Sequence, residues 1–78
     1  MLTYLLFEEN DEEAVYQYYP DGGKASGLIA VVKAIGECRI NELSLNDRHQ
    51  RYALKMFTRL REFASNSSFE REGIVAWS

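Results

Sequence analysis

The chain has 78 residues, of which 46% are hydrophobic and 27% are charged, and its formal net charge is −3. A chain of this length forms one domain, near the size at which a single core is only just sufficient, so two domains are excluded. The balance of apolar and charged residues is that of a folded globular protein and argues against intrinsic disorder.

The chain contains one cysteine, Cys38, and therefore forms no internal disulfide. Such usage is typical of reducing compartments, so we expect a cytoplasmic protein. The apolar run at residues 2–7 has no basic segment before it and is followed at once by two glutamates, which predicts neither a signal peptide nor a membrane span.

Two strands are predicted at the start of the chain, over residues 2–8 and 14–19. The first is apolar on both faces, which indicates a central place in a sheet or a strand that a partner covers. We expect Tyr16 and Tyr18 on the covered face of the second strand, which leaves the alternate positions outward: Val15, Gln17 and Tyr19. The Pro-Asp-Gly-Gly segment at residues 20–23 predicts a turn that closes a hairpin.

A second hairpin is predicted from strands at residues 27–33 and 37–43. The three residues between them, Ala-Ile-Gly, suit a type I turn with Gly36 in the left-handed conformation. This loop sets Lys33 opposite Glu37, and the resulting register assigns one face to water: Lys33, Glu37, Arg39 and Asn41. The other face is expected to meet the helix: Leu28, Ala30, Val32, Cys38 and Ile40.

Residues 44–64 carry the one sustained helical periodicity, with Ser44 and Asp47 resembling a capping box at the start. The apolar stripe consists of Leu45, His49, Tyr52, Ala53, Met56, Leu60, Phe63 and Ala64, with Phe57 at its margin. Residues 73–77 predict a short final strand that pairs with a sheet edge in its own chain or in a second copy. The expected fold is an α+β domain: an antiparallel four-stranded meander with one amphipathic helix packed on one face and a short C-terminal strand, in the order β-β-β-β-α-β.

No residue pattern predicts a catalytic centre, a cofactor site or a metal site. One His and one Cys do not supply the three or four ligands of a zinc site, and we expect His49 at the rim of the core and Cys38 buried and inert. The acidic run at residues 8–13 lacks the spacing of a calcium loop and is interpreted as a solvated turn. The Gly-Gly-Lys-Ala-Ser segment at residues 22–26 lacks the full phosphate-loop pattern. We therefore do not expect an enzyme.

A row of basic side chains follows the helix: Arg48, Arg51, Lys55 and Arg59. Like charges at this spacing destabilise a helix slightly, so the row is either a solvated face or a site for an anion or an acidic partner. Because the chain is acidic overall, nucleic-acid or anion binding through this row is the alternative function and not the leading one.

The leading hypothesis is a small cytosolic protein-interaction module, an adaptor, inhibitor or regulatory subunit, that self-associates through the C-terminal strand. The candidate partner-binding residues are apolar side chains expected at the surface: Tyr19, Ile29, Val31, Leu54 and Trp77. Tyr19, Ile29 and Val31 are expected to gather with Val15 on the water face of the sheet. A protein partner is expected, and neither nucleic acid nor a membrane.

Overall fold

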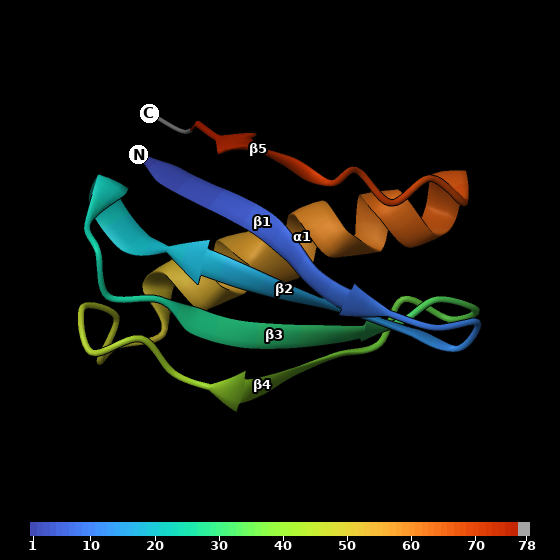
Figure 1. Cartoon of the computed structure of the whole chain (residues 1–78), viewed down its shortest axis with the longest axis horizontal. Helices are drawn as coiled ribbons and strands as arrows, with labels where there is room; N and C mark the ends of the chain where they lie inside the picture. The colour runs from blue at the N-terminus through green and yellow to red at the C-terminus, as the bar shows by residue number, and fades with distance from the viewer. Residues whose placement is uncertain (77–78) are drawn as a thin grey trace.

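The fold is a five-stranded antiparallel sheet with one helix across one of its faces (Figure 1). The computed structural model describes residues 1–76. The elements in chain order are β1 (Leu2–Glu9), β2 (Glu13–Tyr19), the short 3-10 turn η1 (Pro20–Gly22), β3 (Gly27–Val32), β4 (Cys38–Glu42), α1 (Arg51–Asn66) and β5 (Glu72–Val75). In the sheet their order is β4-β3-β2-β1-β5, so the predicted α+β architecture is confirmed.

Tyrosine rings from the two central strands build the middle of the core. The ring of Tyr4 on β1 lies 5.8 Å, between centroids, from both Tyr16 on β2 and Phe63 on α1, with near-perpendicular planes that suit aromatic quadrupoles. Tyr16 and Tyr18 are fully buried, which confirms the prediction for β2. From the helix the core takes the middle of the expected stripe: Ala53, Met56, Leu60 and Phe63.

The register of β3 and β4 differs from the expected one by one residue. Ala30 lies opposite Arg39, and Val31 lies opposite Cys38. Gly36 does adopt a left-handed φ of 74°, but the turn begins at Val32, which accepts a 2.8 Å hydrogen bond from the Gly36 amide. Since a one-residue slip exchanges the two faces of a strand, the larger side chains of β3 enter the core and smaller Ala30 faces the other way. The expectation that Leu28, Ala30 and Val32 meet the helix was therefore wrong.

The helix begins at Arg51, seven residues later than expected. Residues 44–50 form turns, in which the Asp47 amide donates to the Ser44 carbonyl at 3.0 Å and the Gln50 amide donates to the Asp47 carbonyl at 2.8 Å. The start of the predicted stripe was therefore wrong: Leu45 and His49 are exposed. Ser44 is no helix cap either. Its hydroxyl group donates instead to the Ala25 carbonyl at 2.7 Å and ties the turn to the loop before β3.

The short strand β5 pairs antiparallel with β1 in the same chain, as the sequence predicted for this segment. Its register places Gly73 opposite Tyr4, and a Cβ atom at position 73 would lie 2.5 Å from the Tyr4 hydroxyl oxygen. Glycine is thus the residue that lets β5 approach the tyrosine core. Trp77, a member of the expected partner surface, lies outside the described residues.

Candidate interaction face

The helix covers one face of the sheet and leaves the other uncovered. In Figure 1 α1 lies behind the strands, and within residues 1–76 no further element lies over the face turned toward the viewer. Strand alternation and the registers place the following side chains on this surface, here called the open face: Thr3, Leu5, Phe7, Glu8, Glu13, Val15, Gln17, Tyr19, Leu28, Ala30, Val32, Arg39, Glu42, Glu72 and Ile74.

The open face is more apolar than the water-facing side of an antiparallel sheet normally is. Its exposed large apolar side chains lie on the β1 and β5 half: Leu5 is 42% exposed, Phe7 54% and Ile74 53%. Phe7 is the extra residue of a bulge in β1, between Leu6 and Glu8. Apolar area of this kind marks a contact surface when it is contiguous.

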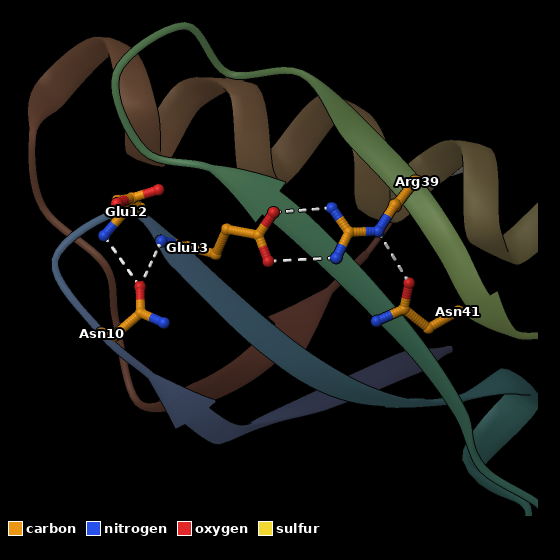
Figure 2. Close-up of polar contacts among 5 residues, drawn as sticks. All are labelled: Asn10, Glu12, Glu13, Arg39 and Asn41. Carbon is orange, nitrogen blue, oxygen red and sulfur yellow. Dashed lines mark hydrogen bonds and ion pairs between the residues drawn. The ribbon is translucent and has the colours of Figure 1, made fainter.

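One ion pair crosses the open face from β2 to β4. The two guanidinium nitrogens of Arg39 donate to the two carboxylate oxygens of Glu13 at 2.6 and 3.0 Å, over the intervening strand β3 (Figure 2). The hydrogen bonds from Arg39 hold the pKa of the Glu13 carboxyl below its usual value. Arg39 Nε also donates to the Asn41 side chain at 3.0 Å, so its orientation on β4 is set from two sides.

The acidic run between β1 and β2 is used in structural contacts. The Asn10 side-chain oxygen accepts the Glu12 and Glu13 amides at 2.8 and 2.9 Å and closes the turn (Figure 2). Glu9 pairs with Lys33 at 2.6 Å. Among the described residues no group of three or more His, Cys, Asp or Glu side chains is arranged to hold a metal ion.

The surface residues expected to bind a partner have three different outcomes. Tyr19 lies half-buried on the open face, and Leu54 is exposed on α1, on the other side of the sheet. Ile29 and Val31 are fully buried against the helix, so their surface placement was wrong, for the reason given by the β3–β4 register. The structure therefore brings together on the open face only Tyr19 and Val15 of the patch expected there.

The residues that sequence reasoning missed are Leu5, Phe7, Leu28 and Ile74. The sequence did contain a signal for Leu5 and Phe7. Large apolar side chains stand at consecutive positions of β1, and such a strand is either central in a sheet or covered by a partner. In the structure β1 is both internal to the sheet and half exposed on one face. The sequence contained no such signal for Leu28 and Ile74, because the sheet face on which each of them lies depends on how its strand pairs with the next.

The basic row divides between exposed and paired side chains. Arg48 and Arg51 are exposed, and Arg48 precedes the helix. Arg59 is half-buried and pairs with Glu62 at 3.3 Å. Lys55 and Arg59 line a hollow of about 230 Å³ between α1 and the end of β5, together with Glu62. The surroundings of the row are therefore of mixed charge.

Cys38 and His49 lie in different environments. The Cys38 sulfur is 3.5 Å from the Gly36 carbonyl and 3.9 Å from the Phe57 carbonyl, and burial raises the pKa of its thiol. A raised pKa disfavours the reactive thiolate. His49 is exposed on the turn before α1.

No protein-family model, curated protein or solved structure matches this chain. Among residues 1–76, no helix has both the length and the apolar character required to cross a bilayer.

Proposed function

We propose that this protein is a small cytoplasmic protein-interaction module whose binding surface is the open face. The observation that carries the proposal is the exposure of Leu5, Phe7 and Ile74 on one uncovered sheet face, beside Tyr19. A sheet in a two-layer domain buries its second face when that face is apolar. Here α1 covers the first face of the sheet, and a partner covers the second. The cytoplasmic location rests on the single reduced cysteine.

The magnitudes indicate how much of the face takes part. Full burial of a Leu, Ile or Phe side chain stabilises by about 1.5–3 kcal/mol. Since the three exposed side chains are about half covered already, covering the rest contributes about 2–4 kcal/mol in total. Association costs about 4–15 kcal/mol in lost motional freedom. Binding therefore requires more of the open face, including its half-buried side chains Tyr19, Leu28 and Val32.

The experiment compares proteins recovered from the native host with the wild type and with two double variants. Leu5→Lys/Ile74→Lys places charges on the open face, and Leu45→Lys/Leu54→Lys places the same charges on exposed leucines away from it. We expect a protein that co-purifies with the wild type and the second variant and is lost with the first. Equal recovery with both variants, each shown by circular dichroism to be folded, would show that the open face is not the binding surface.

The alternative is an anion-binding or nucleic-acid-binding role for the basic row. The observation that favours it is that Glu9 pairs with Lys33 and Glu13 pairs with Arg39, so these two carboxylates are engaged with cations outside the row. Against it stand the net charge of −3 and the Glu62 carboxylate beside Arg59. The mixed charge places this role second.

A further inference from the structure

The charged side chains of the open face are almost all negative. Four of them are glutamates and one is an arginine: Glu8, Glu13, Glu42, Glu72 and Arg39. Four carboxylates against one guanidinium leave a charge of −3 on this face, which equals the formal net charge of the whole chain. Acidic and basic side chains therefore balance elsewhere, and the net charge of the protein is concentrated on one side of the sheet.

Three of these carboxylates have no cationic partner. Arg39 engages both oxygens of Glu13, at 2.6 and 3.0 Å (Figure 2). Glu8, Glu42 and Glu72 are exposed, and none of them forms an ion pair with another residue among residues 1–76. The open face therefore presents free negative charge beside its exposed apolar side chains.

The two outermost glutamates stand at opposite ends of one row across the sheet. Leu5 lies opposite Glu72 and Gln17, and Leu28 lies opposite Gln17 and Glu42. The row therefore crosses all five strands, with leucines inside and a carboxylate at each edge. Four strand spacings separate its two ends by about 19 Å.

A hollow of about 150 Å³ lies at the end of the open face, beside the turn between β1 and β2. It is lined by Glu8, Glu9, Asn10, Glu13 and Val15. Glu9 and Glu13 are each engaged with one cation of the same chain, whereas Glu8 is not. A long basic side chain of a partner can therefore lay its apolar stem against Val15 and place its cation at Glu8.

We propose that the partner of the open face is a basic amphipathic helix of another protein. Its apolar stripe covers the exposed side chains Leu5, Phe7 and Ile74, and Lys or Arg side chains on its flanks face the free carboxylates. This inference rests on the proposed function and names the chemistry of the partner. A second copy of the open face does not fit, because it would place like charges together.

The backbone of the partner decides its form. Strands β1, β2 and β3 already pair on both sides, so an element laid over the face finds no backbone hydrogen-bond partners there. A buried extended segment would leave its own amide and carbonyl groups without partners, whereas a helix satisfies them internally. A helix with its side chains is about 10–12 Å wide. One helix along the strands therefore fits between Glu72 and Glu42, and long basic side chains on its flanks reach both.

The apolar and the charged contacts contribute differently to binding. Covering the apolar side chains supplies most of the affinity, because burial of apolar surface is the larger favourable term. Ion pairs at exposed edges add little affinity each, but they accelerate association and disfavour an acidic partner. The charge of the open face therefore selects among amphipathic helices.

Fluorescence anisotropy with labelled model peptides tests the charge of the partner. The probe is a synthetic helix of about 18 residues, about 27 Å long, with leucines along one stripe and lysines on both flanks. Its counterpart carries glutamate in place of every lysine. We expect the wild type to bind the lysine peptide at least about tenfold more tightly than the glutamate peptide. Equal affinity for the two peptides, or no binding of either, overturns the inference.

Matched protein variants test where the lysine peptide binds. Glu8→Gln/Glu42→Gln/Glu72→Gln removes three carboxylates from the open face, and Asp11→Asn/Asp21→Asn/Glu62→Gln removes three from elsewhere on the surface. The first variant should bind the peptide at least about tenfold more weakly than the wild type, and the second should bind it as the wild type does. Equal weakening in both would show that net charge alone attracts the peptide, which overturns the inference.

A proline in the middle of the lysine peptide tests the helical form. Proline breaks a helix and leaves the charge of the peptide unchanged. We expect the proline peptide to bind at least about tenfold more weakly than its parent. Equal binding of the two peptides would show that the face does not take a helix, and would overturn the inference.

The two proposals fail separately. If another protein co-purifies through the open face and Glu8→Gln/Glu42→Gln/Glu72→Gln retains it fully, the partner is not basic, and the proposed function stands without this inference. If Leu5→Lys/Ile74→Lys binds both the lysine peptide and the co-purifying protein as the wild type does, the open face is not the binding surface and both proposals are wrong.

Discussion

The hydroxyl group of Tyr18 donates a 3.0 Å hydrogen bond to the Oδ2 atom of Asp47 and joins the sheet to the start of the helix. Asp47 lies four positions before Arg51, and its carboxylate accepts the Tyr52 and Ala53 amides at 3.0 and 2.8 Å. These are two of the amide groups that the first turn of a helix leaves without partners. A buried carboxylate outside the helix therefore performs the capping role.

Replacing this carboxylate should cost more than the loss of an ordinary cap. Asp47→Ala removes the acceptor of two helix amides and of the buried Tyr18 hydroxyl, so we expect a loss of about 2–4 kcal/mol in the free energy of unfolding. Tyr18→Phe should cost about 1–2 kcal/mol, since it leaves the Ser44 amide without its 3.1 Å acceptor. Urea denaturation measures both. If the double variant loses the full sum of the two, the residues are not coupled.

Leu60 is fully buried beneath the sheet, as the helical stripe predicted. Leu60→Ala should destabilise the protein by about 2–5 kcal/mol, because the side chain leaves a cavity that the small core fills poorly. Thr58→Ala, two residues away on the exposed side of α1, is the control. Thermal unfolding compares the two variants, and equal melting temperatures would contradict the helix placement.

Side-chain alternation in β2 and the helical period of α1 were readable from the sequence, and they correctly placed the tyrosines of β2 and the buried residues of α1 in the core. The pairing of β3 with β4 was not readable. Residues 27–32 are apolar on both faces. The expected and the observed register would therefore expose similar amounts of apolar surface, and the sequence pattern does not favour either. The register depends on whether the turn begins at Val32 or at Lys33. These two turns differ in backbone geometry, and residue propensities do not distinguish them. Ile29 and Val31 were misplaced for this reason.

The error in the predicted helix start had a similar cause. A local capping box was expected at Ser44, but Asp47 acts on amides five and six residues away through a turn. Contacts at this spacing depend on the path of residues 44–50, which Tyr18 and Ala25 anchor from other parts of the chain. The residues of the open face were hard to predict for both reasons, because they depend on four strand registers and on which side of the sheet the helix covers.

The burial of tyrosine hydroxyls makes the fold sensitive to alkaline pH. Burial, and to a lesser degree the hydrogen bond to Asp47, raises the pKa of Tyr18 to about 12 from an ordinary value of 10.0. A raised pKa means that the folded state holds the proton more tightly. Stability from this group is therefore complete below pH 10 and is lost as the pH rises toward 12.

Urea denaturation at a series of alkaline pH values measures this dependence. The free energy of unfolding of the wild type should fall between pH 10 and 12, and it should fall less steeply in Tyr18→Phe. A wild type whose stability is level across this window would show that the hydroxyl ionises as it does in the unfolded chain.

The Glu13–Arg39 pair gives a prediction at acidic pH. The Arg39 guanidinium lowers the pKa of the Glu13 carboxyl, so its contribution to stability is present above the unfolded pKa and is lost as the pH falls through the folded one. Carbon-13 NMR titration should show that the pKa of Glu13 is lower in the wild type than in Arg39→Gln. A Glu13 titration that Arg39→Gln leaves unmoved would contradict the ion pair.

The basic row separates the two functions, because α1 and the open face lie on opposite sides of the sheet. Arg51→Gln/Lys55→Gln/Arg59→Gln should leave protein binding through the open face unchanged. We expect wild-type protein not to bind random-sequence DNA or RNA at micromolar concentration in physiological salt, since the chain is acidic and Arg59 is paired with Glu62. Fluorescence anisotropy with labelled oligonucleotides measures this binding.

A charge-matched control makes the result specific to the row. Lys24→Gln/Arg61→Gln/Arg71→Gln removes the same number of cations elsewhere on the surface. Phosphate contacts by the row would make wild-type affinity fall with salt at a log–log slope of roughly −0.7 to −0.9 per contact. Wild-type binding that shows this slope, persists in the control variant and disappears in the row variant would establish the basic row as a nucleic-acid site. Such a result would move the primary function from the open face to the helix.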